Sequence, residues 1–420
     1  MTDAVLSSRY ERKISPVERL FLVGDKLYPP FVSQLVLEGQ GEFDLQCWQS
    51  AARRVSVTNP GCRLVLRGNL GWSRWVDSAV SPAVHLINGE SWNGKDPENA
   101  PFLKRPLPAR SGPTFEVLLL TGNPNRVIFR THHGVMDGGG GLRFINEFFR
   151  ELRGEKSLES TGSYTGLDLA RRLGAGRMKI EENDCQSPLP AITIDDSVRD
   201  SYWRRITVAG NHSKLLGRIA FVVAQHAHNA NRRAVGMTVS GDSKPVKSPV
   251  VRLEITTDMR QHCPEDTPTT ANLIGLITIN VSDTDTVADI INTIVRHRGG
   301  DLEGQLESTL APIRWVPIPV LAYYWRRRTR LACKKNLFAS SASLSSIGRL
   351  PIENYQGGGF NADTAFVIPP GNSGIPLLIT FNSAGQNTEI VAMVPDSGLI
   401  HAQLENLLEV LRETLEQNSR

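Results

Sequence analysis

One seven-residue run constrains the fold of this chain more than any other feature of its sequence. It reads His132-His-Gly-Val-Met-Asp-Gly138, and three more glycines follow it. Apolar residues predict a strand at 126–130 before the run and a helix at 142–152 after it. Two histidines and a carboxylate are therefore expected in a turn at the mouth of a sheet, which favours a mixed α/β architecture.

The residue types in this turn are suited to proton transfer. A histidine at the mouth of a sheet can act as a general base near neutral pH, because its unperturbed pKa is about 6.5. Asp137 can hold the turn by pairing with a cation elsewhere in the chain. Gly138 and the glycines after it permit positive φ and a close approach of the backbone. The alternatives are that the histidine pair binds a metal or only satisfies the turn.

Length and composition limit the class of protein. A chain of 420 residues is longer than the roughly 250–300 that one hydrophobic core supports, so two domains are expected. Hydrophobic residues at 40% and charged residues at 21% exclude a disordered, collagen-like or coiled-coil chain. The formal net charge of +4 is too weak over this length to indicate nucleic-acid binding.

Other sequence features predict a cytoplasmic protein without metal or cofactor. The five cysteines form no close pairs, which is typical of reduced thiols. Residues 1–21 lack the apolar core of a signal peptide, and no run of 18 apolar residues could span a membrane. His226 and His228 lie two apart on a predicted helix and share no face, while the glycines at 138–141 lack the P-loop lysine.

The chain is predicted to fold as an α+β sandwich in two halves. Residues 1–153 form the N-terminal half, residues 154–200 a charged, Gly- and Ser-rich crossover linker, and residues 201–420 the C-terminal half. Helices are expected from residue 44 to about 58, at 142–152, 212–230 and 286–297, and from residue 400 to the end of the chain. Strands are expected at 31–38, 63–67, 115–120, 126–130, 202–208, 235–240, 250–256, 274–281, 341–347, 364–368, 377–381 and 389–394.

The histidine run resembles the HHxxxDG signature of the chloramphenicol acetyltransferase-like superfamily. That superfamily includes nonribosomal peptide condensation domains, plant BAHD acyltransferases, wax ester synthases and mycobacterial polyketide-associated acyltransferases. The resemblance covers most of the chain, although HHxxxDG is its one highly specific motif. Weaker similarities lie at 15–22, 59–66, 112–113, 257–260, 272–275 and 345–348. The resemblance implies two related halves arranged as a V with a central channel.

The resemblance also implies roles for single residues. His133 would lie in the channel and deprotonate an acceptor hydroxyl or amine, which then attacks an acyl thioester, while His132 would serve the turn. Asp137 would point away from the substrate and pair with an arginine, for which Arg260 is the candidate. Ser346 stands where the superfamily often has asparagine near the tetrahedral intermediate. Its hydroxyl could donate to an oxyanion, or it is an ordinary strand serine.

Three further features refine this interpretation. The DFGWG motif of BAHD enzymes is absent and residues 360–365 do not supply it, so a BAHD enzyme is disfavoured. No carrier-protein or adenylation segment is attached, so we expect a free-standing protein. A basic cluster at 325–335 could dock an acidic carrier protein, a CoA phosphate or an anionic membrane surface. The plainer interpretation, a solvated face beside a buried helix, is preferred from sequence.

The sequence therefore predicts a cofactor-independent acyltransferase of secondary metabolism, with His133 as general base. The donor would be an acyl thioester on CoA or on a phosphopantetheinyl carrier protein. The acceptor would be a hydroxyl or amine on a small molecule or a carrier-bound intermediate. Two alternatives remain: an amide-forming nonribosomal-peptide-type condensation enzyme, and a non-catalytic recruitment scaffold of the same fold. The intact His133, Asp137 and Gly138 favour catalysis.

Overall fold

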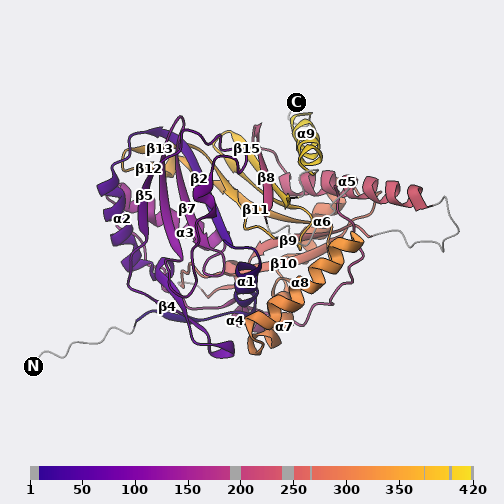
Figure 1. The fold of residues 1–420 in the computed structure, drawn as a ribbon, viewed down its shortest axis with the longest axis horizontal. Helices are drawn as coiled ribbons and strands as arrows, with labels where there is room; N and C mark the ends of the chain where they lie inside the picture. The colour runs from indigo at the N-terminus through magenta and orange to yellow at the C-terminus, as the bar shows by residue number, and fades with distance from the viewer. Residues whose placement is uncertain are drawn as a thin grey trace, which may run out of the picture.

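Two six-stranded sheets and a small three-stranded sheet organise the chain (Figure 1). The computed structural model describes residues 9–189, 200–238, 250–264, 267–372, 374–396 and 400–417. The three-stranded sheet joins β1 (Glu11–Lys13), β4 (Arg74–Asp77) and β3 (Leu64–Arg67). Among the described residues, no helix combines the length and the apolar character that crossing a bilayer requires.

The first six-stranded sheet carries the histidine turn at the end of one strand. Its strands lie in the order β12 (Gln356–Gly357), β13 (Phe360–Ile368), β2 (Val32–Gly41), β7 (Asn125–His132), β6 (Phe115–Thr121) and β5 (Ala83–Asn88). Helices α2 (Leu45–Thr58) and α3 (Gly138–Leu152) cover one face, where Trp48 and Phe148 pack on Phe129. The other face packs through Leu118 and Ile128 against Trp203 of the second sheet. Because both faces are covered, β6 and β7 are almost continuously buried.

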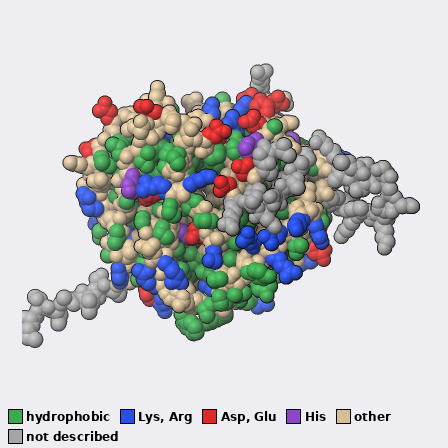
Figure 2. Space-filling view, viewed as in Figure 1, with side chains coloured by type: hydrophobic (Ala, Val, Ile, Leu, Met, Phe, Trp, Pro, Cys, Tyr) green, Lys and Arg blue, Asp and Glu red, His purple; other side chains and the backbone are tan. Residues whose placement is uncertain are grey.

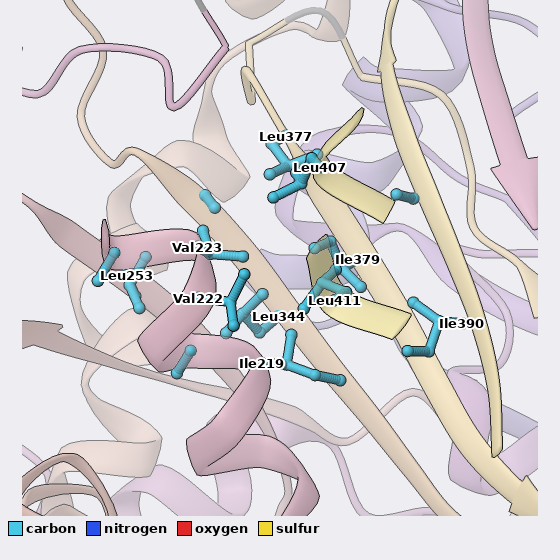
Figure 3. Packing of buried hydrophobic residues seen from close by; sticks show 14 of the residues in the cluster. Ile219, Val222, Val223, Leu253, Leu344, Leu377, Ile379, Ile390, Leu407 and Leu411 are labelled. Carbon is cyan, nitrogen blue, oxygen red and sulfur yellow. The ribbon is translucent and has the colours of Figure 1, made fainter. Parts of the chain in front are cut away.

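The second six-stranded sheet has its own helical layer. Its strands lie in the order β10 (Ile274–Asn280), β9 (Arg252–Asp258), β11 (Ala342–Leu350), β14 (Leu378–Ala384), β15 (Asn387–Pro395) and β8 (Ser201–Ala209). Helices α5 (Leu215–Thr238), α6 (Val287–His297) and α9 (His401–Gln417) cover it. Figure 3 shows Val222 and Val223 of α5 and Leu411 of α9 facing Leu344 and Ile379 of the strands. This cluster forms the core of the second half.

The two sheets repeat one topology, which confirms the predicted class of two related α/β halves. Apart from inserted elements, the first half runs β2, α2, β5, β6, β7, α3, and the second runs β8, α5, β11, β14, β15, α9. In each half the last two strands form an antiparallel hairpin. The first strand pairs antiparallel with the last, and the strand before the hairpin lies parallel to the hairpin's first strand.

Strand β13 crosses from one half to the other. It lies in the range expected for the C-terminal half, yet it pairs antiparallel with β2 of the first sheet, with Phe366 opposite Val36. The first sheet is therefore completed by residues far along the chain. The linker expected at 154–200 contains the short helix α4 (Gly166–Arg172) and a bridge from Cys185 to Phe338, while residues 190–199 lie outside the described ranges.

Helices outside the two repeats gather beside the histidine turn. Helix α1 (Pro16–Leu27) starts with a capping box, in which Ser15 and Glu18 satisfy each other's backbone N–H groups. It packs against α7 (Gln305–Leu310) and α8 (Ile318–Lys335). Short 3-10 helices complete the chain: η1 (Pro60–Arg63), η2 (Leu70–Trp72), η3 (Pro101–Lys104), η4 (Met259–His262), η5 (Asp301–Gly304), η6 (Ala311–Trp315) and η7 (Ile352–Asn354).

One predicted element is wrong in type. The strand expected at 235–240 is instead the last part of α5, which continues to Thr238, and residues 239–240 lie outside the description. The residues before it, Asn229 to Ala234, contain no glycine or proline that would end a helix. The helix therefore continues into a segment whose β-branched residues had favoured a strand.

Candidate active site

The backbone of His133 is held from both halves of the molecule. Strand β7 ends at His132, and the next residue leaves the sheet while its N–H donates to the carbonyl of Phe31 at 3.0 Å. The carbonyl of His133 accepts a 2.6 Å hydrogen bond from the side-chain amide of Asn272, which lies just before β10. The turn is thus fixed where the first half meets the second.

The imidazole of His133 is half-buried between a serine and two aromatic rings. Its Nδ1 atom lies 2.8 Å from the hydroxyl of Ser33 on β2. The ring of Phe21 on α1 stacks on the imidazole at 4.6 Å between centroids, and Phe31 lies at 5.8 Å. When Nδ1 carries the ring proton and donates it to the Ser33 oxygen, the free electron pair of the neutral ring lies on Nε2.

Burial lowers the pKa of His133 to about 4. The carboxylate of Asp137 and the backbone of Met136 act in the opposite direction, while the neighbouring His132 adds to the lowering of the pKa. Because this pKa lies well below neutrality, the imidazole is uncharged at pH 7. An uncharged imidazole has the free electron pair that a general base needs.

His132 serves the architecture of the turn. Its side chain is fully buried, and its Nδ1 accepts a 3.1 Å hydrogen bond from the N–H of Gly134. The proton of a neutral ring must then lie on Nε2, which faces a carboxylate oxygen of Asp25 at 3.6 Å. The ring also packs edge-on against Trp75. These contacts leave His132 directed into the protein.

The structure brings Asp137 and Arg260 together. Arg260 lies on η4 of the second half and donates to both carboxylate oxygens of Asp137, at 2.7 and 3.1 Å. Asp137 also caps α3 by accepting from Gly140 N–H at 2.7 Å, and it accepts from Leu273 N–H at 2.7 Å. Burial alone would raise the pKa of Asp137, but Arg260 and these hydrogen bonds outweigh it and hold the pKa below its usual value.

Arg260 has further partners that fix its guanidinium. It donates to a carboxylate oxygen of Asp258 at 2.9 Å and also to the carbonyl of Ala271. The ion pair with Asp137 is largely withdrawn from water, with Arg260 18% and Asp137 5% exposed. Asp137 therefore faces Arg260 and the backbone, as its predicted architectural role requires. That role remains a proposal.

The glycines after Asp137 do not adopt left-handed backbone, so the expectation of positive φ is wrong for them. Gly138 to Gly141 form the first turn of α3, and none of them is among the glycines with positive φ. Close packing requires two of them. A Cβ on Gly140 would lie 2.3 Å from the carbonyl oxygen of Thr270, and one on Gly139 would lie 2.6 Å from Arg260. Gly138 has ordinary space beside Ile347, at 3.4 Å.

Ser346 lies exposed on β11, at a point where the pairing with β14 shifts register between Ser346 and Gly348. The adjacent Ile347 reaches the first residue of α3, Gly138. Strand β11 therefore passes beside the start of the helix that follows the histidine turn. The predicted contact of Ser346 with an oxyanion stays a prediction.

Sequence reasoning missed the side chains that surround His133. Ser33 and Phe21 contact its ring, but they lie about a hundred positions earlier in the chain and form no local pattern with it. Asn272 belongs to a segment noted for its similarity, without a role assigned to it. A strand expected at 31–38 indicates that Ser33 faces one side of a sheet, but only the pairing of β2 with β7 brings it to His133.

A hollow of about 640 Å³ opens to solvent on the face of β2 opposite to the face that carries Ser33. Strand alternation turns Val32 and Gln34 into it, away from Ser33. Trp203, Met393 and Ile368 contribute from the second half and from β13. This hollow thus lies between the two sheets but not on the side of β2 that carries Ser33. The predicted channel through the His133 side stays a prediction.

Comparisons with known proteins give matches to solved structures only. No protein-family model matches the sequence, and no curated protein matches it. The structure is similar to the epimerization domain from the third module of tyrocidine synthetase B, with a TM-score of 0.55 at 12% identity over 97% of this chain and 96% of that one.

Two further solved structures are similar as well. Polyketide synthase associated protein 5 from Mycobacterium tuberculosis has a TM-score of 0.57 at 11% identity, over 96% of this chain and 97% of that one. The trichothecene 15-O-acetyltransferase from Fusarium sporotrichioides has a TM-score of 0.56 at 12% identity, over 96% and 94%. The starter condensation domain of the rhizomide synthetase RzmA is also similar, with a TM-score of 0.55 at 14% identity over 96% of each chain. The chain therefore has the fold that these condensation-type domains and acyltransferases share.

Proposed function

We propose that this protein is an acyltransferase that moves an acyl group from a thioester to a hydroxyl or amine acceptor. One observation carries the proposal: the half-buried imidazole of His133 is fixed at Nδ1 by Ser33 in a turn anchored to both halves. In the proposed reaction Nδ1 carries the ring proton and Nε2 takes the proton of the substrate. The fold shared with condensation domains and an acetyltransferase supports acyl or amide-forming transfer as the reaction class.

The proposed reaction needs only one proton-transfer group. The imidazole of His133 takes the proton of the acceptor O–H or N–H, and the acceptor electron pair attacks the thioester carbonyl carbon. The resulting tetrahedral oxyanion collapses, the C=O bond re-forms and the C–S bond breaks. The leaving thiolate takes the proton from the imidazolium, which gives an ester or amide and a free thiol.

Neighbouring side chains assist the proposed reaction without exchanging protons themselves. The carboxylate of Asp137 favours the imidazolium form of His133, so it stabilises the charge that appears during the reaction. The ion pair with Arg260 keeps that carboxylate ionised and in place. Ser346 is the proposed hydroxyl donor to the oxyanion. The donor is CoA or a phosphopantetheinyl carrier protein, and the setting is secondary metabolism.

Mass spectrometry of the products tests the proposal. Purified protein is incubated with acyl-CoAs or acylated carrier proteins, each combined with alcohols or amines. Wild-type protein is expected to form at least one ester or amide. His133→Ala is expected to lower that rate by about 10²–10⁴-fold, the usual contribution of a positioned general base. Product class also separates ester formation from amide-forming condensation.

Two controls make the result decisive. His297→Ala removes the last residue of α6, which contributes nothing to the proposed site, and should leave the rate unchanged. Circular dichroism checks that both variants fold. Undiminished product formation by His133→Ala would remove this residue from the mechanism. Failure of wild-type protein with every donor and acceptor would favour the non-catalytic scaffold.

A further inference from the structure

The outward face of α8 exposes an unusual set of side chains. Val320, Tyr324, Arg327, Leu331 and Lys334 follow the spacing i, i+4, i+7, i+11 and i+14, which places them on one side of a helix. Tyr323 lies beside them. All six are exposed, whereas Ala322, Ala332 and Cys333 on the opposite side are buried.

A pair of tryptophans extends this face beyond the helix. Trp315 ends η6, three residues before the start of α8, and packs edge-on against Trp72 at 5.1 Å between centroids. We call Trp72, Trp315, Val320, Tyr323, Tyr324, Arg327, Leu331 and Lys334 the α8 surface. Its six hydrophobic members are 41–71% exposed, and they are half of the twelve large hydrophobic side chains exposed among the described residues.

The same helix is strongly cationic. Its sequence contains Arg326, Arg327, Arg328, Arg330, Lys334 and Lys335 and no acidic residue. Figure 2 shows Lys and Arg side chains gathered along α8, with hydrophobic side chains on the adjoining surface below. A merely solvated face, the interpretation preferred from sequence, would not concentrate aromatic side chains in this way. The combination favours a partner that is both negatively charged and able to take up apolar side chains.

The α8 surface rests on a rigid base. Arg19 of α1 donates to the carbonyls of Ile313 and Val316, at 3.1 and 2.5 Å, so η6 and the start of α8 are tied to α1. Helix α1 packs along α8 and carries Phe21, the ring stacked on His133. The exposed side chains are therefore presented by ordered structure.

We propose that the α8 surface docks the protein onto a bilayer that contains anionic lipids. Trp and Tyr side chains suit the membrane–water interface, because they combine an apolar ring with a polar atom. Basic side chains beside them attract anionic headgroups, and a helix of 18 residues lies about 27 Å along such a surface. This docking does not depend on the acyl-transfer reaction.

Two other partners fit the α8 surface less well. A second copy of this chain would bring like charges face to face, because a two-fold interface places the same patch on both subunits. An acidic carrier protein would match the charges, but it gives no reason for two exposed tryptophans and two exposed tyrosines on one surface. A lipid surface takes up both kinds of side chain without needing a complementary shape.

Vesicle co-sedimentation with the full chain tests the proposal. The protein is mixed with vesicles of phosphatidylcholine and phosphatidylglycerol, or of phosphatidylcholine alone. We expect binding to the anionic vesicles, weaker binding as salt rises, and little binding to phosphatidylcholine. Arg327→Gln with Lys334→Gln should weaken binding by about 25-fold, since each basic residue at an anionic surface strengthens it by about fivefold.

A second pair of variants tests the apolar contribution. Tyr324→Gln with Leu331→Gln should weaken binding to the same vesicles by about tenfold, because two partly exposed apolar groups no longer enter the interface. Arg53→Gln with Lys95→Gln removes the same number of charges elsewhere and should leave binding unchanged. Thermal melting checks that all three double variants remain folded.

Three outcomes would overturn the proposal. Wild-type protein that fails to sediment with anionic vesicles would show that the surface does not bind lipid. An equal loss of vesicle binding by the Arg53→Gln, Lys95→Gln variant would show that only the net charge of the protein matters, and not the α8 surface. Binding of an acidic carrier protein that depends on Arg327 and Lys334, without vesicle binding, would assign the surface to that partner. None of these outcomes depends on whether the protein transfers acyl groups.

Discussion

At the scale of single residues, the surroundings of His133 favour the neutral imidazole. Burial beside Phe21 and Phe31 disfavours the charged ring, and Asp137 offsets that only in part. A general base must be unprotonated before it can accept a proton. The lowered pKa therefore extends toward acid the pH range in which His133 is ready to act.

The pH dependence of the proposed reaction follows from this shift. The pKa of His133 is lowered to about 4, so the neutral base persists until the pH falls to that region. We expect kcat/KM to stay level as pH falls through 6.5, the ordinary histidine value, and to drop at about pH 4. Steady-state rates across the acid range measure this, with circular dichroism at each pH as the folding control. A half-maximal rate near pH 6.5 would contradict the buried imidazole.

Single residues also mark the limit of what sequence reasoning could reach. The motif spacing and the similarity pointed to Asp137 and Arg260 as a pair, and the structure places them in contact. Ser33 could not be found in this way, because its contact with His133 depends on the register of β2 against β7. The expectation of positive φ at the glycines was wrong. A side chain is excluded at Gly139 and Gly140 because Arg260 and Thr270 of the other half pack against them.

At the scale of elements, the histidine turn and the first residues of α3 form a contact surface for η4 and Thr270 of the second half. Asp137 caps the helix and binds Arg260, and the two glycines that follow at 139 and 140 let η4 and Thr270 approach the helix backbone. The start of α3 is thus shaped by a partner more than a hundred residues away in sequence. Alanine at Gly140 and alanine at the next glycine, Gly141, should therefore change the free energy of unfolding in opposite directions.

Alanine substitutions at Gly140 and Gly141 test that contrast. A Cβ at Gly140 would lie 2.3 Å from the carbonyl oxygen of Thr270, so Gly140→Ala should lower the free energy of unfolding by roughly 1–3 kcal/mol. Gly141 has open space around its Cβ position, so Gly141→Ala should raise it by about 0.5–1 kcal/mol. Urea denaturation measures both. Similar effects at the two positions would contradict the close approach.

The Asp137–Arg260 ion pair is the second test at this scale. Asp137→Asn keeps an N-cap side chain but leaves Arg260 short of its main counter-charge, which should cost roughly 3–5 kcal/mol. Arg260→Gln should cost a similar amount. The double variant should lose less than the sum, because the two residues are coupled. Thermal or urea unfolding of all three variants gives the coupling, and additive losses would break the proposed pair.

Elements with a clear local pattern were predictable, and those decided by distant contacts were not. The hairpin at 115–130 and the amphipathic C-terminal helix appear in the structure as β6, β7 and α9. Strand β5 was not among the predicted strands, and it forms because β6 offers a parallel edge. The start of α1 was not expected, although Ser15 and Glu18 form a capping box there.

At the scale of the whole molecule, a buried group of charges joins the two sheets. Arg205 of β8 donates to Glu389 of β15 at 2.8 Å and to Glu38 of β2 at 2.7 Å. Arg126 of β7 donates to the same Glu38. The guanidinium of Arg205 lies over the ring of Phe366 on β13, at 3.8 Å. This group binds the halves at the seam where β13 crosses between them.

Removing Arg205 should therefore destabilise the joined halves. Arg205→Ala leaves two buried carboxylates without their shared partner, which should cost roughly 3–5 kcal/mol in unfolding free energy. Arg74→Ala serves as the matched control, since the ion pair with Glu11 is half exposed on both sides and should contribute at most about 1 kcal/mol. Differential scanning calorimetry measures both. Equal melting temperatures for the two variants would contradict a structural seam at Arg205.

The path of β13 also has a consequence for synthesis of the chain. A growing polypeptide emerges from the ribosome in order, so β2 is made long before the strand that will cover its edge. Until that strand arrives, the nascent first half presents a row of unpaired backbone groups, the kind of edge that templates aggregation. Pairing over so long a sequence separation also slows folding. The first sheet can therefore be completed only after residue 368 has been synthesised.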